Sequence, residues 1–216
     1  MPKAPFTPTL PRLYAILDVD LTAARGLAPL DVAREWMEGG ARLLQLRAKA
    51  LESGPLLSLA CDLVALARRF EAAVVVNDRP DIACLSGADG VHVGQGDLPP
   101  AAVRRVMPAG LLGLSTHTDD QFSAALSTPA TYIAVGPVFG TATKDTGYAA
   151  VGLDFVRRSA SRSDRPVVAI GGITLENAAE VIAAGAASVA VISDLLRGEP
   201  RRRAREFVAR TGGLLL

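Results

Sequence analysis

The stretch Ala73-Val74-Val75-Val76-Asn77-Asp78 joins a short apolar run directly to two polar residues. A run of this kind, rich in valine, is typical of a parallel strand that is buried on both faces. The same order of apolar run and polar patch recurs along the chain. The runs are RLLQL (42–46), AVVV (73–76), GVHV (90–93), LLGL (111–114), YIAV (132–135) and VVAIGG (167–172). In a parallel barrel the carboxyl ends of all strands meet at one rim, so the pattern predicts both the fold and the place of the site.

Longer amphipathic segments separate the apolar runs. We expect strands at 12–18, 42–48, 72–78, 90–94, 111–116, 132–138, 166–171 and 188–192. We expect helices near 29–39, 53–70, 80–86, 99–107, 119–127, 152–162, 174–184 and 199–210, with Thr174 as an N-cap and Gly185 at a C-terminal cap. This alternation predicts an α/β fold, a (β/α)8 TIM barrel in a single compact domain, over residues 12–212 after an N-terminal extension at 1–11. An open doubly wound sheet would favour a Gly-x-Gly-x-x-Gly turn after the first strand, which is not found after Asp18.

Composition points away from large anionic partners. The 216 residues include 23 basic and 22 acidic side chains, a net charge of +1, which gives no overall reason to expect binding to nucleic acid or to a membrane surface. The first twelve residues hold four prolines and do not resemble a secretory signal. We therefore expect a cytoplasmic protein with small-molecule substrates, for which a homo-oligomer is possible. Cys61 and Cys84 lie in apolar, helix-like context and are predicted to be small buried hydrophobes.

Gln45, Arg47 and Lys49 alternate along one predicted strand, so all three point to the same side. That side would face the mouth of the barrel, while the apolar side would face the helices. Arginine can bind phosphate with two N–H groups at once, and lysine adds a movable charge. The alternative is a solvated strand end with incidental charges.

Asp78 and Asp97 follow the third and fourth predicted strands and would converge in a parallel sheet. Paired carboxylates with few nitrogen or thiol ligands suit Mg²⁺, which usually also takes substrate phosphate oxygens. The alternative is that each carboxylate caps the helix that follows it, where Pro80 and Pro99 stand at suitable positions.

Two further patches suit a phosphate group. The stretch 140–144 is small, hydroxylated and basic, although it could also be an unspecialised surface loop. Gly171-Gly172 and Ile192-Ser193 follow the last two strands, where this fold commonly binds phosphate. Glycine lets backbone N–H groups approach an anion closely, although the pair could equally make a tight turn.

The chain has two histidines. His92 lies inside a strand and is predicted to be structural, whereas His117 follows the fifth strand and could reach a substrate. A zinc or iron site built from several histidines is excluded, and no Gly-x-Ser-x-Gly motif signals a catalytic triad.

Taken together, the patches resemble the thiamine-phosphate synthase family, from about Leu13 to Leu196. The matching pieces are Gln45-x-Arg47-x-Lys49, Val76-Asn77-Asp78-Arg79, Ala88-Asp89-Gly90-Val91-His92-Val93-Gly94-Gln95-x-Asp97, Gly113-x-Ser115, Gly136-Pro137-Val138-Phe139-x-Thr141-x-Thr143-Lys144, Gly171-Gly172-Ile173 and Val191-Ile192-Ser193. The family joins 4-amino-2-methyl-5-hydroxymethylpyrimidine diphosphate to a thiazole phosphate, which can be carboxylated, and gives thiamine phosphate and diphosphate. Diphosphate is thought to leave first, and the thiazole nitrogen then captures the pyrimidine carbocation.

The resemblance also implies roles for individual residues. It implies that Arg47, Lys49, Asn77 and Lys144 hold the diphosphate, that Asp78 and Asp97 hold Mg²⁺, that Gln45 and Ser115 line the pyrimidine end, and that Thr141, Thr143, Gly172, Ile192 and Ser193 hold the thiazole phosphate. Among these it marks Arg47, Lys49, Ser115 and Lys144 as catalytic. One departure is Gly140, at a position that proline often occupies in the family.

Two other functions stay open. A thiazole tautomerase of the sister family would share the barrel and the phosphate site, would need no diphosphate or metal site, and would use His117 as an acid or base. The third hypothesis is a barrel that senses a phosphorylated ligand and has lost catalysis. The retained set Arg47, Lys49, Asn77, Asp78, Asp97 and Lys144 argues against both.

Overall fold

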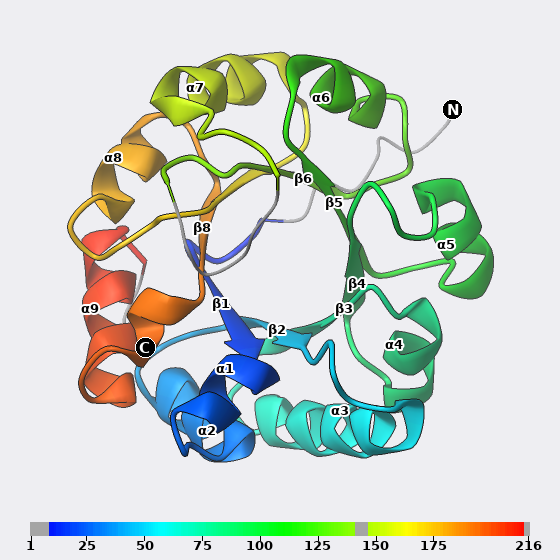
Figure 1. Ribbon diagram of the computed structural model, residues 1–216, viewed down its shortest axis with the longest axis vertical. Helices are drawn as coiled ribbons and strands as arrows, with labels where there is room; N and C mark the ends of the chain where they lie inside the picture. Colours follow the sequence, from blue (N-terminus) through cyan, green and yellow to red (C-terminus); the bar gives the residue numbers. More distant parts are fainter. Residues whose placement is uncertain (1–8, 141–146, 214–216) are drawn as a thin grey trace.

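Eight parallel strands close into a barrel in the computed structural model, which describes residues 9–140 and 147–213 (Figure 1). The strands are β1 (Leu13–Asp18), β2 (Leu43–Arg47), β3 (Ala73–Asn77), β4 (Gly90–Val93), β5 (Leu111–Thr116), β6 (Tyr132–Val135), β7 (Val167–Ile170) and β8 (Ser188–Val191). Each strand pairs with the next in the chain, and Ala15 of β1 pairs with Val191 of β8 to close the ring. The predicted TIM barrel is confirmed.

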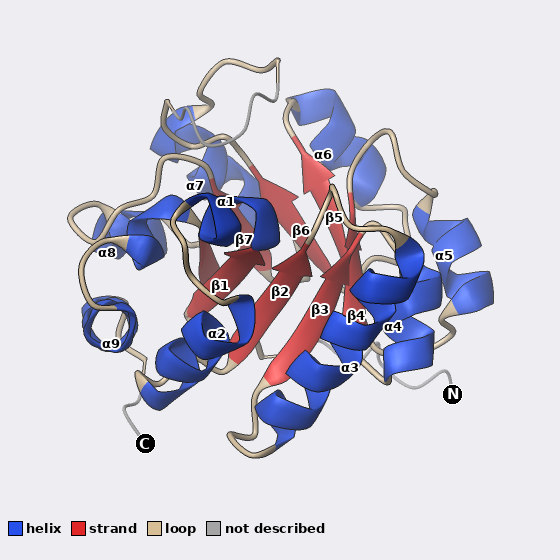
Figure 2. Ribbon diagram, turned by 60° about the horizontal axis from the view of Figure 1, so that its bottom comes forward, coloured by secondary structure: helices blue, strands red, loops and turns tan. Residues whose placement is uncertain are grey.

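Helices form the outer ring around the strands (Figure 1). They are α1 (Val19–Ala24), α2 (Pro29–Glu38), α3 (Ser53–Arg68), α4 (Pro80–Ser86), α5 (Pro100–Val106), α6 (Asp119–Ala125), α7 (Gly152–Arg162), α8 (Ala178–Ala183), the 3₁₀ helix η1 (Ser193–Leu196) and α9 (Pro200–Arg210). The strand arrowheads in Figure 2 point to one side of the molecule, so the loops that follow the strands gather there.

The strand residues alternate between two cores. Val74 and Val76 pack outward in the core beneath the helices, which also buries Trp36 and Phe207. Val75 points inward, in a smaller core inside the barrel. The members of that inner core are Leu10, Tyr14, Ile16, Leu43, Val75, Tyr132, Ala134, Val168 and Ala190. Burial on both faces explains why the strands are apolar runs rather than alternating ones.

Some local expectations were wrong. The short helices α1 and η1 were not predicted, and α8 begins at Ala178 rather than at Thr174. Thr174 is not an N-cap, because its N–H donates to the side chain of Asn177 at 2.8 Å and the chain turns before the helix begins. Gly185 does follow the end of α8, with φ +103°.

The two cysteines were also misplaced by the sequence analysis. Cys61 on α3 and Cys84 on α4 are both exposed free thiols rather than buried hydrophobes. Apolar neighbours in the sequence indicated a helix correctly, but not which face of it each cysteine occupies. Within residues 9–140 and 147–213, no helix has the length and apolar character needed to cross a membrane.

We expect Gly113→Ala to destabilise the protein strongly. A Cβ at this β5 position would overlap the His92 ring and the Tyr132 ring inside the barrel. Overpacking of this kind costs about 1–3 kcal/mol and sometimes more, which urea unfolding would measure. Gly54→Ala on α3 is the matched control, because the added methyl group would meet no atom within 4 Å. Equal free energies of unfolding for the two variants would contradict the packing described.

Candidate active site

Two adjoining cavities open at the carboxyl ends of the strands. One, of about 70 Å³, lies mainly beyond β2 to β4, and the other, of about 260 Å³, lies beyond β5 to β8. Four residues line both cavities, namely Ser115, Ile170, Ala190 and Ile192. A ligand in one cavity would therefore meet a ligand in the other at this shared wall.

The smaller cavity gathers the predicted polar residues of the first half of the chain. Its lining includes Gln45, Arg47, Lys49, Asn77, Asp78 and Asp97. The predicted alternation on β2 is confirmed, because Leu44 and Leu46 pack in the outer core while Gln45 and Arg47 line the cavity. These residues come from β2, from β3 and from the loops that follow β2, β3 and β4, and they meet because the three strands are neighbours in the barrel.

Ion pairs orient the two cations of this cavity. Arg47 Nη1 pairs with Asp18 Oδ2, and Lys49 Nζ lies 2.6 Å from Asp78 Oδ2. Asp18 is buried at the end of β1. Its side chain also accepts a hydrogen bond from the N–H of Leu21 at 3.0 Å and so caps the start of α1. Asp18 thus fixes Arg47 from the neighbouring strand, a contact that the sequence analysis missed.

Neither carboxylate predicted to bind metal caps a helix. The residue before α4 is Arg79 and the residue before α5 is Pro99, and neither helix has a side-chain cap in the described part of the chain. Asp97 Oδ2 instead accepts the N–H of Gly94 at 2.8 Å. The capping alternative is therefore wrong for both Asp78 and Asp97.

The electrostatics of this pair suit a divalent cation. Burial raises the pKa of the Asp97 carboxyl, and the adjacent Asp78 carboxylate raises it further, while Lys49 acts in the opposite direction. A cation beside both carboxylates would relieve that repulsion. No cluster of three or more His, Cys, Asp or Glu occurs within the described residues, so the protein could supply two oxygen ligands and leave the rest to phosphate and water.

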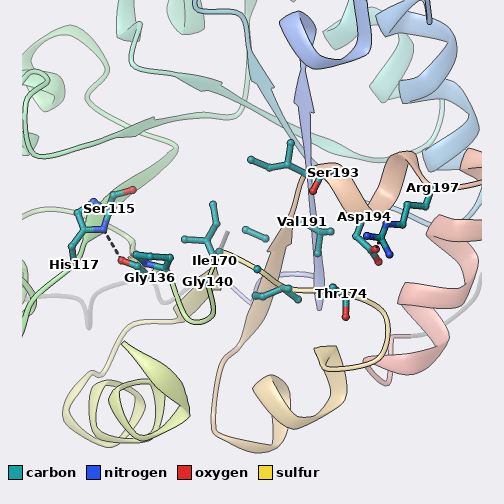
Figure 3. A pocket seen from close by; sticks show the side chains of 16 residues that line it. Ser115, His117, Gly136, Gly140, Ile170, Thr174, Val191, Ser193, Asp194 and Arg197 are labelled. Carbon is teal, nitrogen blue, oxygen red and sulfur yellow. Dashed lines mark hydrogen bonds and ion pairs between the residues drawn. The ribbon is translucent and has the colours of Figure 1, made fainter. Parts of the chain in front are cut away.

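The larger cavity is lined by the predicted glycine pair and by the residues after β8. Gly171 and Gly172 have φ +99° and +64°, and a Cβ at Gly172 would lie 2.6 Å from the carbonyl oxygen of Gly140. The glycines are therefore required where the loop after β6 crosses the loop after β7. Ile192 and Ser193 complete the same wall, and Figure 3 shows Ser193 beside Asp194. Thr141, Thr143 and Lys144 lie outside the described residues.

A chain of hydrogen bonds runs through the inside of the barrel to the shared wall. Gln45 Nε2 donates to the Tyr14 hydroxyl at 2.9 Å, and the hydroxyl groups of Tyr14 and Tyr132 are 3.0 Å apart. His92 Nδ1 lies 3.0 Å from the Tyr132 hydroxyl, and its Nε2 lies 2.8 Å from Ser115 Oγ. His92 is buried, as its predicted structural role requires, but it also lines the smaller cavity and holds Ser115 in place.

His117 lines the larger cavity on the side opposite Asp194 and Arg197 (Figure 3). Its Nδ1 lies 2.6 Å from the carbonyl oxygen of Gly136, which can only accept, so Nδ1 carries the proton. The ring stacks on Tyr148, with the ring centroids 4.3 Å apart. These contacts tie the end of β5 to the loop after β6.

Comparison with known proteins agrees with this geometry. The model of the thiamine monophosphate synthase family matches residues 13–195. The chain belongs to the thiamine-phosphate synthase family. It is similar to the thiamine-phosphate synthase of Koribacter versatilis, with 46% identity over 92% of this chain and 95% of the relative. A synthase of Thermus thermophilus is 44% identical over 87% of this chain and 91% of the relative.

A solved structure supports the same assignment. The thiamine phosphate pyrophosphorylase of Pyrococcus furiosus superposes with a TM-score of 0.85 at 30% identity, over 94% of this chain and 96% of that one. The resemblance to the thiamine-phosphate synthase family that the sequence motifs indicated is therefore confirmed.

The buried tyrosines predict an alkaline loss of stability. Burial raises the pKa of both Tyr14 and Tyr132 above the ordinary value. Above about pH 10 the unfolded chain releases both phenolic protons while the folded protein keeps them, so the free energy of unfolding falls by up to about 1.4 kcal/mol per pH unit for each tyrosine. Below that pH neither tyrosine contributes to the pH dependence.

Urea unfolding between pH 8.5 and 11 would measure this slope. Tyr14→Phe removes one of the two phenols. The fall in its free energy of unfolding with pH should therefore be shallower than that of the unmodified protein, by up to about 1.4 kcal/mol per pH unit. Other alkaline groups are common to both proteins and cancel in the comparison. Identical slopes would contradict the buried, neutral state of Tyr14.

Proposed function

We propose that this protein joins 4-amino-2-methyl-5-hydroxymethylpyrimidine diphosphate to 4-methyl-5-(2-phosphoethyl)thiazole, or to its carboxylated form, and releases diphosphate and thiamine phosphate. One observation carries the proposal: two cavities of different chemistry meet at a shared wall on one rim. Membership of the thiamine-phosphate synthase family supports it. The reaction is an alkyl transfer, and the protein is a transferase.

The smaller cavity suits the diphosphate. Arg47 can offer two N–H groups to phosphate oxygens, Lys49 adds a charge, and the Asn77 amide adds a donor. We assign Lys144, which lies outside the described residues, to the same diphosphate from its position in the family motif. When the diphosphate binds, Lys49 can exchange Asp78 for a phosphate oxygen, since its side chain is half exposed.

We propose that Asp78 and Asp97 hold Mg²⁺ beside the diphosphate. When bound, the ion would neutralise charge that develops on the leaving diphosphate. The cation would also remove the repulsion that raises the pKa of Asp97. Arg47, positioned by Asp18, would stabilise the same leaving group from the other side.

The bond changes need positioning more than a protein nucleophile. The C–O bond breaks and its electron pair leaves with the diphosphate; the thiazole nitrogen then gives its lone pair to the exocyclic carbon of the pyrimidine. A carboxylated thiazole also loses CO₂. We propose that Gln45 and Ser115 hold the pyrimidine, because both lie in the hydrogen-bond chain that Tyr14, Tyr132 and His92 hold rigid.

The larger cavity suits the thiazole phosphate. Gly172 allows a close approach of the backbone, and Ile192 and Ser193 line the same side. We assign Thr141 and Thr143, which lie outside the described residues, to the same phosphate from the motif. The substrates are small molecules; a cytoplasmic location and a homo-oligomer stay predictions.

The two alternative functions explain fewer of the residues that line the two cavities. A thiazole tautomerase needs the larger cavity and His117 but gives no role to the cluster Arg47, Lys49, Asp78 and Asp97. A ligand-binding barrel without catalysis gives no reason for two cavities of different chemistry at a shared wall. Turnover decides among the three functions.

We expect the purified protein to form thiamine phosphate from both substrates only when Mg²⁺ is present. Removal of the metal with EDTA should abolish product, and added Mg²⁺ should restore it. Asp78→Asn should lower kcat by about 10²-fold or more without changing the thermal midpoint greatly, because it removes one of two metal ligands. Asp81→Asn, at an exposed site on α4, is the control and should retain activity. No product with both substrates and Mg²⁺ would refute the proposed function.

We expect His117→Ala to lower kcat for thiamine phosphate formation by less than about tenfold, because the proposed reaction uses no protein acid or base at this position. A tautomerase that used His117 as acid or base would lose about 10²- to 10⁴-fold. Steady-state kinetics of the coupling reaction would measure the loss for the synthase. A loss of about 10²-fold or more in coupling would contradict the role given to His117.

A further inference from the structure

Arg197 follows η1 and lines the larger cavity, yet neither the family motifs nor the function proposed above gives it a role. It is the only lysine or arginine in that lining within the described residues. A phosphate monoester bound there would be a dianion, and charge-assisted hydrogen bonds from arginine are the strong, directional way to hold one. The inference rests on the proposed function, which places such a phosphate in this cavity.

Asp194 holds the guanidinium of Arg197 by one nitrogen. Arg197 Nε lies 3.2 Å from Asp194 Oδ1, and the Arg197 backbone N–H donates to the Asp194 carbonyl at 3.2 Å. Within the described residues the two terminal nitrogens of Arg197 form no hydrogen bond or ion pair, although the guanidinium also attracts the fully exposed Glu176 carboxylate, whose pKa it helps to lower. These two nitrogens are the pair that can bind two phosphate oxygens in parallel.

Asp194 is itself firmly fixed. It is only 3% exposed, and its Oδ2 accepts from Arg203 at 2.5 Å and from the N–H of Leu175 at 3.0 Å. Asp194 therefore joins α9 to the loop after β7. Its Oδ1 is buried and accepts no hydrogen bond within the described residues, where the ion pair with Arg197 is its polar contact.

Arg197 and Arg203 both pair with Asp194 but differ in exposure, which indicates different roles. Arg203 is 14% exposed in its side chain and supports the fold, whereas the side chain of Arg197 is 70% exposed and borders the cavity. In Figure 3 Arg197 and Asp194 lie together beside Ser193, across the cavity from His117. An arginine held only at Nε, next to a cavity wall of glycine and serine, is arranged to receive an anion.

We propose that Arg197 binds the phosphate of the thiazole substrate through its terminal nitrogens and makes the protein select phosphorylated over unphosphorylated thiazole. Asp194 is the positioning residue, because its carboxylate is fixed by Arg203 and Leu175 and holds the guanidinium of Arg197 at Nε. No covalent change is involved. The residue adds to the backbone and serine groups of the proposed phosphate site.

The test compares Arg197→Ala and Arg197→Lys with the unmodified protein. Two thiazoles serve as substrates, the 2-phosphoethyl compound and the corresponding 2-hydroxyethyl alcohol. Arg197→Ala should raise KM for the phosphorylated thiazole by about ten- to a hundredfold, the loss expected for a charge-assisted hydrogen-bond pair. KM for the pyrimidine diphosphate and kcat/KM for the alcohol should stay unchanged. For Arg197→Lys, KM for the phosphorylated thiazole should lie between the other two values, since lysine keeps the charge but not the paired N–H donors.

A binding measurement makes the test independent of turnover. Titration calorimetry with the phosphorylated thiazole alone should show the same loss of affinity in Arg197→Ala. Arg34→Ala is the control, because Arg34 also forms an i,i+3 ion pair, with Asp31 on α2, but lines neither cavity. The control should match the unmodified protein in every reading.

The outcomes separate this inference from the proposed function. An unmodified protein that couples the substrates while Arg197→Ala keeps its KM for the phosphorylated thiazole would overturn the role of Arg197 alone, leaving it a surface ion-pair partner. Equal losses with the phosphorylated thiazole and the alcohol would overturn it as well, because they would indicate a general structural effect. An unmodified protein that neither binds nor couples the thiazole would refute the proposed function instead.

Discussion

The pairing of β1 with β8 is the constraint on which the rest of the molecule depends. Three residues of β1 pair with three of β8, from Leu13 with Val189 to Ala15 with Val191. In an open sheet of the same strands, the loops after β2 and after β8 would lie far apart. Closure brings them together, so that Ile192 lines the same cavity as Arg47 and Lys49. The two cavities adjoin only because the sheet has no edges.

Inside the ring, four buried polar side chains are joined by hydrogen bonds among the apolar residues of the inner core. Tyr14, Gln45, His92 and Tyr132 come from four strands, and each forms a hydrogen bond with another of the set. A buried polar group without a partner would cost about 1–3 kcal/mol, so the set is stable only when complete. This series of hydrogen bonds ends at Ser115, which lines both cavities. The barrel interior therefore provides a rigid base for the place where the two substrates are proposed to meet.

Sequence patterns predicted the features that are encoded in neighbouring residues, such as the strands. They missed features that depend on contacts between distant parts of the chain. Short apolar runs indicated all eight strands, six of them followed by polar patches, because two-sided burial requires such runs. The positions of Asp78 and Asp97 at the rim were predicted correctly, because the loops that follow the strands lead there. Asp18 was missed, since its role depends on a contact with Arg47 across neighbouring strands, and Arg197 lies in a turn that no repeated pattern marks. The exposed cysteines show likewise that apolar context indicates a helix but not which face of it a residue occupies.

Each of the two cavities at the rim is lined by at least one cationic side chain of its own. Two anchored anionic substrates could therefore react in the proposed coupling without a nucleophile from the protein. A diphosphate and a phosphate monoester repel one another, so each needs its own cationic site. Arg47 and Lys49 line one cavity, and Arg197 lines the other. The wall between them is largely apolar, formed by Ile170, Ala190 and Ile192 around the hydroxyl of Ser115. If both substrates are anchored by their anionic ends as proposed, the reacting carbon and nitrogen would meet at this wall, and that positioning would favour capture by the thiazole over capture by solvent.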